Sequence, residues 1–256
     1  MTQSRFPVRR LPDGRALLNL GSNTRVAPGW NNVDFSWIIR LGRHPTLCRM
    51  LHRLGFLSQA RYERIQQLDP QTVVWDLRRG IPFPDQTFDA VYHSHVLEHI
   101  DRDGAAGFLG ECRRVLKPGG IVRIVVPDLE TLARRYIAVV DALPSRGTME
   151  AHTSAVEAMI DQMIVRTPKV RAQQKRLVQW AEHVLIGDTA RAGVLHRWMY
   201  DRFSLGELLR ASGFERVRDL TPTTSQIGDW KAFNLDTEPD GTTYKPDSLY
   251  LEGSRI

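Results

Sequence analysis

The chain has 256 residues, of which 42% are hydrophobic and 25% charged, a length that suits one substantial α/β domain with additions and is short for two domains. Its formal charge of +6 comes without a recognised nucleic-acid-binding module, and its two cysteines lack metal-ligand spacing, so neither a nucleic-acid partner nor a structural zinc site is expected. The sequence has no run of about 18 apolar residues and no apolar stretch within its basic start, which predicts neither a membrane span nor a secretory signal and gives the expectation of a cytoplasmic protein.

The stretch LLNLGSNTRVAPGWNNVD, from Leu17 to Asp34, contains two short apolar runs, the first ending at a polar turn and the second on a carboxylate. Gly21 permits a sharp turn and a close approach of backbone N–H groups to a ligand, and an acid at the next strand end can accept hydrogen bonds from ribose hydroxyls. Only 13 positions separate Gly21 from Asp34, fewer than the roughly 20 of a dinucleotide-binding fingerprint. We therefore predict a nucleotide-like ligand, a short or absent first helix, and no nicotinamide cofactor.

Residues 40–64 form the densest basic stretch, in which six arginines face a single acid, Glu63. Leucine and methionine at helical spacing predict an amphipathic helix that ends at Gly55. A solvated helix face is the simplest interpretation of the charge. Attraction to an anionic substrate or to a membrane surface is the alternative, so peripheral membrane contact stays open.

Three apolar runs rich in β-branched residues follow, and each is predicted to be a buried strand: 72–77, 88–94 and 119–127. Apolar spacing predicts a helix over 104–116, with Cys112 on its buried side and Pro118 and two glycines as its stop. Strands that alternate with helices predict a doubly wound, mostly parallel sheet, in which ligands bind beyond the carboxyl ends of the strands.

From about Tyr136 the pattern changes to helix without strand. Residues 136–200 are predicted to be a helical insertion within a single domain of residues 1–256, with a break at Thr167 and Pro168 and a second helix that runs to Leu185 and stops at Gly187. An insertion at this point can cover a site, which makes it a candidate lid.

The last part of the chain predicts a helix and two closing strands. Ser204 and Glu207 have the spacing of a capping box, and Gly213 supplies a left-handed C-terminal cap. ERVRDL and SLYLEG are the predicted strands, and the polar stretch between them is predicted to be loop.

The succession NLGSNTR, NVD, WDL, PFPDQTFDAVYHSHVLEH and ECRRVLKPGGIVRIVVPD, from Leu17 to Asp128, resembles the motif series of class I S-adenosylmethionine-dependent methyltransferases of the type 11 group. FDAV, HVLEH and RVLKPGG at their intervals are its most specific part. HRWMYDRFSLGELLRASGF also resembles the tail of methyltransferases of cell-surface polysaccharide and glycolipid biosynthesis. The resemblance implies a Rossmann-like fold, S-adenosylmethionine as cofactor, and a small-molecule or saccharide-containing acceptor, with a glycolipid precursor among the candidates.

The same resemblance implies which residues hold the cofactor. Gly21, Ser22 and Asn23 would lie against its methionyl and ribose portions, and Asp34 would hold the ribose hydroxyls, with Phe35 on the adenine. The family usually has a second glycine near Asn23, and asparagine can take that place because it tolerates a positive φ.

Asp76 would accept from the adenine amino group beside the Leu77 backbone, and His93 and Ser94 would border the sulfonium and carboxylate. For Asp34 and Asp76, a turn or N-cap role is the alternative interpretation.

In-line methyl transfer asks the protein to align the acceptor with the methyl group and to exclude water, and a base is needed only for some acceptors. For a hydroxyl acceptor, His95 and His99 are the candidate bases, with His196 and Tyr200 as later contributors. A helix-end hydrogen bond is the structural alternative for each of them. The working hypothesis is methyl transfer to oxygen, and the sequence does not identify the acceptor.

Two other classes stay open. HSHVLEH resembles the HxHxDH cluster of metallo-hydrolases, but the spacing differs by one residue and the downstream histidines, His152, His183 and His196, fall in the predicted helical region, so no metal is assigned. A non-catalytic protein that keeps the fold is the second, motivated by Asn23.

Overall fold

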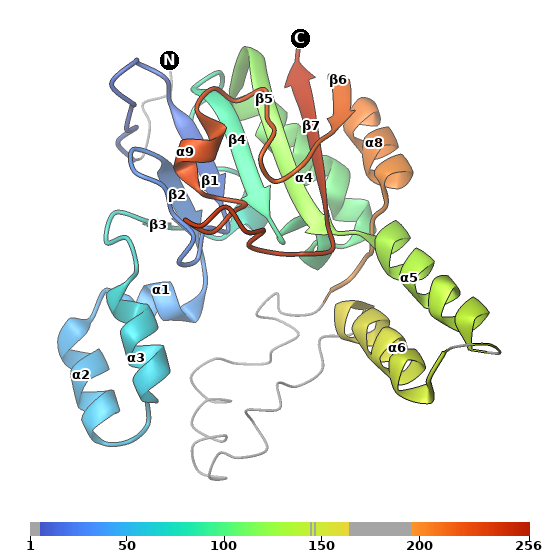
Figure 1. The fold of residues 1–256 in the computed structure, drawn as a ribbon. Helices are drawn as coiled ribbons and strands as arrows, with labels where there is room; N and C mark the ends of the chain where they lie inside the picture. Colours follow the sequence, from blue (N-terminus) through green and yellow to red (C-terminus); the bar gives the residue numbers. More distant parts are fainter. Residues whose placement is uncertain (1–5, 144, 146, 164–195) are drawn as a thin grey trace.

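The computed structural model describes residues 6–143, 145, 147–163 and 196–256 (Figure 1). A seven-stranded sheet has the order β3-β2-β1-β4-β5-β7-β6, in which β7 alone runs antiparallel to its two neighbours. This confirms the doubly wound, mostly parallel sheet. The strands are β1 (Leu17–Leu20), β2 (Asn31–Asp34), β3 (Val73–Val74), β4 (Phe88–Ser94), β5 (Leu116–Pro127), β6 (Phe214–Asp219) and β7 (Ser248–Arg255).

The helices of the described residues are α1 (Trp37–Gly42), α2 (Pro45–Arg53), α3 (Gln59–Gln66), α4 (Arg102–Val115), α5 (Leu129–Ala142), α6 (Met149–Met163), α8 (Arg202–Ala211) and α9 (Trp230–Phe233). Figure 1 shows α1–α3 and α5–α6 on the side of the sheet where the parallel strands end. Both groups are therefore placed to surround a ligand at the carboxyl ends. In the part of the chain that the structure describes, no helix is both long and apolar enough to cross a membrane.

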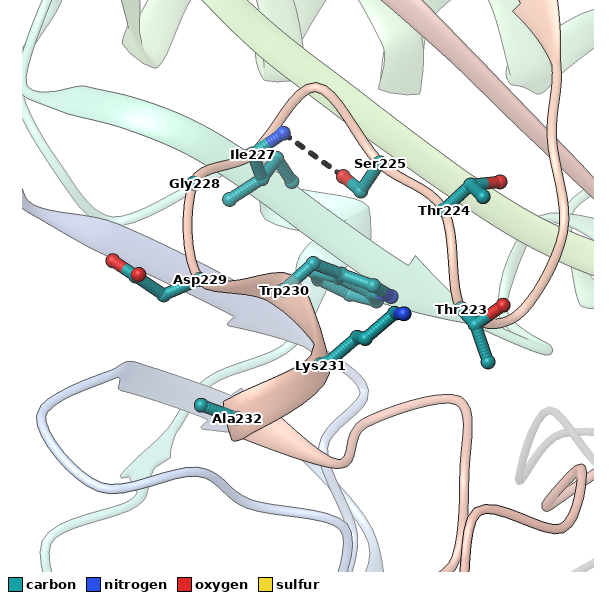
Figure 2. A pocket seen from close by; sticks show the side chains of 9 residues that line it. All are labelled: Thr223, Thr224, Ser225, Ile227, Gly228, Asp229, Trp230, Lys231 and Ala232. Atoms are coloured by element: carbon teal, nitrogen blue, oxygen red, sulfur yellow. Dashed lines mark hydrogen bonds between the residues drawn. The ribbon is translucent and has the colours of Figure 1, made fainter.

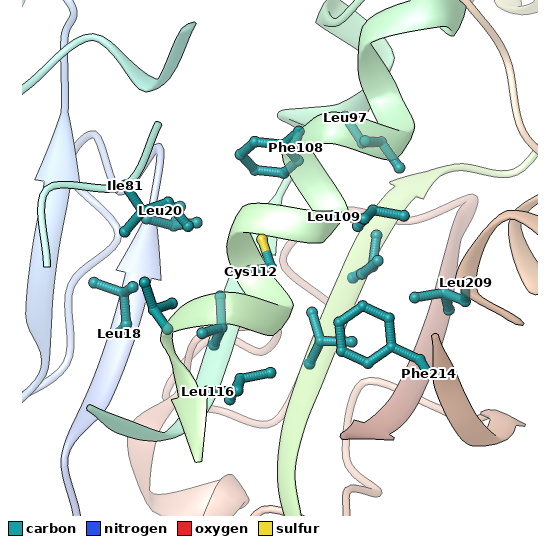
Figure 3. Close-up of a cluster of buried hydrophobic side chains, with 14 of the residues drawn as sticks. Leu18, Leu20, Ile81, Leu97, Phe108, Leu109, Cys112, Leu116, Leu209 and Phe214 are labelled. Atoms are coloured by element: carbon teal, nitrogen blue, oxygen red, sulfur yellow. The ribbon is translucent and has the colours of Figure 1, made fainter. Parts of the chain in front are cut away.

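One face of the sheet packs against α4 and α8 (Figure 3). Leu18 and Leu20 of β1 point to this face, where Phe108, Leu109 and Cys112 of α4 fill the core. Alternate residues of a strand point to opposite faces, so the same alternation sends Leu17 of β1 to the other side. The core position predicted for Cys112 is confirmed.

The other face is covered by an unexpected element, the segment of residues 220–247 that joins β6 to β7. No helix connects β1 to β2, as the short spacing predicts. In its place Ile227, Trp230 and Leu235 pack with Trp30 and Tyr92 on the sheet, and Figure 2 shows Ile227 in the turn that leads into α9 and Trp230 at the start of that helix. The prediction of loop holds for this segment apart from the short helix α9, but its packing on the sheet was not predicted, because its apolar residues are too irregularly spaced to show a period.

Four local expectations differ from the structure. The predicted strand 72–77 is β only at Val73–Val74, after which Asp76 caps a 3-10 turn, and β5 already begins at Leu116. Helix α5 begins at Leu129, ahead of the predicted insertion start, and residues 196–199 are not helical. The predicted break at Thr167–Pro168 and the helix end at Leu185–Gly187 lie outside the described residues.

The cap of α8 also differs. Asp201 is its N-cap and forms the capping box with Ser204, three residues earlier than the predicted Ser204–Glu207 pair. Gly213 does adopt the predicted positive φ of 82°.

Candidate active site at the carboxyl ends of β1 and β4

The glycine turn after β1 has a shape that only particular residues allow. Gly21 has a φ of 68°, and a Cβ there would collide with the side chain of Val96. Asn23 has a φ of 46°, so asparagine does occupy the left-handed conformation that was expected of it. The turn is tied to β2, since the N–H groups of Gly21 and Ser22 donate to the carbonyl of Val33.

Asp34, at the end of β2, stabilises this turn by accepting hydrogen bonds from backbone N–H groups. Its Oδ2 accepts from the N–H of Asn23 at 2.9 Å and its Oδ1 from the N–H of Ser36 at 2.6 Å. The carboxylate is buried, which places a negative charge directly behind the turn. Ribose binding by Asp34 stays a prediction, and the turn role is the one that the contacts show.

A cavity of about 260 Å³ opens beside the glycine turn, where β1 and β4 end. Five predicted site residues meet on its wall: Gly21, Ser22, Asn23, Ser94 and His95. The buried hydroxyl of Ser22 has no hydrogen-bond partner among the described residues, so a polar ligand atom would satisfy it. Gly21, at which a side chain would collide with Val96, Asn23 in its left-handed conformation and the unsatisfied Ser22 hydroxyl together fit a polar nucleoside-type cofactor.

Other predicted residues lie off this wall. Phe35 is 44% exposed, 5.5 Å from the Arg40 guanidinium. Asp76 accepts from the backbone and guanidinium of Arg78, and the hydrogen bond from that side chain lowers the pKa of Asp76. Leu77 follows in the same 3-10 turn and packs against the core.

His93 faces away from the cavity because the residues of β4 alternate. Tyr92 and Ser94 point to the cavity, whereas the His93 ring is fully buried against Phe108 of α4. Burial lowers the pKa of His93 to about 4, so the ring is neutral. Only the main chain of His93 is left to border a cofactor.

His95 follows β4 directly and is held in an uncommon conformation. Its φ is 54°, and its N–H donates to the carbonyl of Val125. Its ring lies between two groups, with Nδ1 3.1 Å from Oε1 of Glu98 and Nε2 3.1 Å from Oγ of Ser248. Burial lowers the pKa of His95, and the ring is therefore a neutral base on the cavity wall.

Glu98, fully buried behind His95, is the centre of a second group of side chains. Burial disfavours its charge, but the hydrogen bond and charge interaction with His95, together with His99 and a backbone hydrogen bond, outweigh this and lower the pKa of Glu98. His99 and His196 lie beside it with ring centroids 4.8 Å apart, and burial together with Glu98 raises the pKa of Tyr200 to about 12. The structure thus gathers all the candidate bases, but only His95 lines the cavity.

Sequence reasoning missed the other residues of the wall, some of them next to predicted ones and some distant in sequence: Asn19, Arg25, Arg64, Tyr92, Tyr244 and Lys245. Arg64 comes from α3, within the basic stretch, and Nη2 of Arg64 donates to Oδ1 of Asn23 at 3.2 Å. Tyr244 and Lys245 arrive from the segment between β6 and β7, and burial lowers the pKa of Lys245. The cluster of arginines in residues 40–64 was a sequence signal for Arg64. No motif pointed to Tyr244 and Lys245.

A larger hollow of about 520 Å³ surrounds α9 (Figure 2). Its Asp229 pairs with Arg15, just before β1, so it lies toward the amino ends of the strands. It contains no predicted site residue and lies at the wrong end of a parallel sheet for the ligand.

Comparisons with known proteins find methyltransferases. Residues 53–124 match the family model described as "Methyltransferase domain". Demethylmenaquinone methyltransferase of Tropheryma whipplei is 41% identical over 126 residues, which are 49% of this chain and 46% of that protein. Ubiquinone/menaquinone biosynthesis C-methyltransferase UbiE of Paracoccus denitrificans is 31% identical over 131 residues, 48% of this chain and 49% of that protein.

The chain therefore spans about half the length of these curated relatives. Among solved structures, a SAM dependent methyltransferase from Archaeoglobus fulgidus is similar with a TM-score of 0.41 at 14% identity, over 98% of this chain and 88% of that one. On the motif series and the sequence matches, the chain is similar to class I S-adenosylmethionine-dependent methyltransferases, whose cofactor is S-adenosylmethionine.

Proposed function

We propose that this protein transfers a methyl group from S-adenosylmethionine to a hydroxyl-bearing small molecule. The observation that carries the proposal is the cavity in which the Gly21–Asn23 turn and His95 share one wall. The turn supplies a cofactor cradle and His95 a proton acceptor. Both functions are needed at the same place for methylation of a hydroxyl.

On the cofactor side, the sulfonium would supply an activated methyl group when bound. Ser22 and the Asn23 turn would hold the methionyl and ribose portions, and Asp34 would help to fix the ribose. Phe35, with Asp76 and the Leu77 backbone, is proposed for the adenine end, and Ser94 for the methionyl end. Closure of the wall by Tyr244 and Lys245 would exclude water from the reacting atoms.

On the acceptor side, His95 would take the hydroxyl proton at Nε2. The neutral ring can donate Nδ1–H to Glu98, which leaves Nε2 as the acceptor, and the Ser248 hydroxyl already lies 3.1 Å from that atom. The acceptor hydroxyl would replace the Ser248 hydroxyl at Nε2, which requires the Ser248 side chain to rotate away. His99 is off the wall, and we assign the proton transfer to His95 alone.

Two acceptor atoms follow from this arrangement. Deprotonation of the hydroxyl turns its oxygen into the nucleophile, so methylation at oxygen is our first proposal. Saccharide-containing precursors are among the candidate acceptors. The relatives are named for methylation of demethylmenaquinone and for C-methyl transfer, which favours a ring carbon as the second candidate. Loss of the proton from a ring hydroxyl would activate either atom.

The experiment is a transfer assay with S-adenosylmethionine labelled with ¹³C at the methyl group, against a panel of quinols, catechols and sugars. Nuclear magnetic resonance of the product distinguishes an O-methyl from a C-methyl group. Binding of S-adenosylhomocysteine is measured in parallel by calorimetry. Cofactor binding without transfer to any acceptor would favour the non-catalytic alternative.

The basic stretch suggests where the protein works. Helix α2 and the turn after it expose apolar side chains between arginines, among them Met50 and Leu54, the latter 61% exposed. A basic amphipathic helix binds anionic lipid. We propose peripheral contact with the cytoplasmic face of a membrane, and expect sedimentation with phosphatidylglycerol vesicles but not with phosphatidylcholine vesicles.

A further inference from the structure

Behind the cavity wall, three metal-ligating side chains meet from distant parts of the chain. One ligand atom each of Glu98, His99 and His196 lies within 4.8 Å of the others. Glu98 and His99 belong to the 3-10 turn Leu97–His99 after β4, and His196 lies in the segment before Tyr200. The N–H groups of Arg197 and Trp198 donate to the Glu98 carbonyl, which fixes that segment against the turn.

The Glu98 carboxylate is the group in this cluster that most needs a partner. It is fully buried, and apart from its contact with His95 neither of its oxygens has a hydrogen bond among the described residues. A buried carboxylate whose oxygens are incompletely hydrogen-bonded is costly, and such groups in native proteins are usually satisfied by a further partner such as a water molecule or an ion. Tyr200 adds a second buried oxygen without a partner in the same part of the structure.

We propose that Glu98, His99 and His196 hold one divalent transition-metal ion. Two imidazoles and one carboxylate are typical ligands of zinc and iron, whereas magnesium and calcium prefer all-oxygen sites. Tetrahedral zinc bonds of about 2.0 to 2.2 Å place ligand atoms roughly 3.3 to 3.6 Å apart, so the most widely separated pair in the cluster would move together by up to about 1.5 Å on binding.

The ion would act on the cavity through Glu98. The carboxylate lies between His95 on the cavity wall and the two ligand histidines, with Oε1 3.1 Å from His95 Nδ1 and 3.9 Å from His196 Nε2. A metal-bound carboxylate that also accepts from a histidine holds that ring in one orientation. This last step, a positioning role toward His95, rests on the proposed function, whereas metal binding does not.

The test uses the full chain freed of any histidine tag, stripped with a chelator and titrated calorimetrically with zinc chloride. We expect one tight site per chain, and a cobalt-loaded sample with the visible absorption bands of nitrogen and oxygen coordination. Glu98→Gln and His196→Asn should each weaken zinc binding at least tenfold. His44→Asn, at an exposed position, and His152→Asn are the matched controls and should leave it unchanged.

Circular dichroism and S-adenosylhomocysteine binding show whether each variant is folded. The His196→Asn variant alters a loop residue and keeps the test decisive if Glu98→Gln fails to fold. Absence of a stoichiometric site, or equal zinc affinity in His196→Asn and the controls, would overturn the metal site. Metal binding with no methyl transfer would leave the site standing and count against the proposed function alone.

Discussion

The backbone N–H of Asn23 donates to Oδ2 of Asp34 across 2.9 Å, which joins the turn after β1 to the end of β2. The carboxylate therefore sets the conformation of the very turn that lines the cavity. A substitution at Asp34 should therefore alter the conformation of the Gly21–Asn23 turn, whether or not the carboxylate itself contacts the ribose.

Replacing Asp34 by Ala should weaken S-adenosylhomocysteine binding by about 1 to 3 kcal/mol, since hydrogen bonds to a charged group are lost. Isothermal titration calorimetry measures the change. Asp141→Ala, on the exposed side of α5, is the matched control and should bind as the unmodified chain does. Equal affinity of a folded Asp34→Ala variant would remove this residue from the site.

Asn23 gives a test of backbone conformation alone. Because its φ is 46°, Asn23→Gly should keep the turn, whereas Asn23→Ala should lower the free energy of unfolding by about 1 to 2 kcal/mol relative to the glycine variant. Urea denaturation compares the two. Both variants lose the contact with Arg64, so the difference between them isolates the conformational cost.

His95→Asn keeps a residue that tolerates the positive φ but removes the base. With a hydroxyl acceptor, kcat should fall by about 10²- to 10⁴-fold while S-adenosylhomocysteine affinity stays the same. Single-turnover transfer and calorimetry give the two numbers, and exposed His44→Asn is the control. A variant with full kcat would show that the acceptor loses its proton elsewhere.

Arg123 of β5 is fully buried between two carboxylates, 2.7 Å from Asp236 and 2.8 Å from Glu252. Arg123→Met leaves both acids buried without their partner and should cost about 3 to 5 kcal/mol of unfolding free energy in urea. The exposed pair of Arg134 and Glu130 on α5 is the comparison. Arg134→Met should change stability by less than about 1 kcal/mol, and similar losses in the two variants would contradict the assignment.

The cap of α8 gives a prediction with a pH dependence. Asp201→Ala should cost about 0.5 to 2 kcal/mol at pH 7, whereas Glu207→Ala, the partner expected from sequence, should cost little. The hydrogen bond from the Ser204 N–H lowers the pKa of Asp201, so its contribution is complete above its unfolded value near 4 and is lost as the pH falls through the folded value. The urea denaturation midpoints of the unmodified chain and of Asp201→Ala should therefore converge below pH 4.

The sheet could be predicted because apolar runs of β-branched residues are a local signal. The turn at Gly21 could be predicted because a positive φ favours glycine, so a glycine directly after an apolar run indicates a turn. The cavity wall could be predicted only where it follows those strands. The alternation of β4 could have assigned Ser94 to the cavity and His93 to the core, since Ala90 and Tyr92 share the face of Ser94.

The rest of the wall depends on chain segments that meet only in the folded state. Tyr244 and Lys245 carry no motif, and the sequence distance between His99 and His196 hides their contact. The irregular spacing of Ile227, Trp230 and Leu235 hides a core segment in the same way. Neither propensity nor periodicity contains information about such long-range neighbours.

The cover formed by residues 220–247 also bears on the order of folding. It joins Asp229 to Arg15 over a sequence separation of 214 residues, and contacts of such long range form slowly because a large loop must close first. The cavity is incomplete until this cover docks and delivers Tyr244 and Lys245. Affinity for S-adenosylhomocysteine should therefore appear in the slowest refolding phase, later than the secondary structure of the sheet.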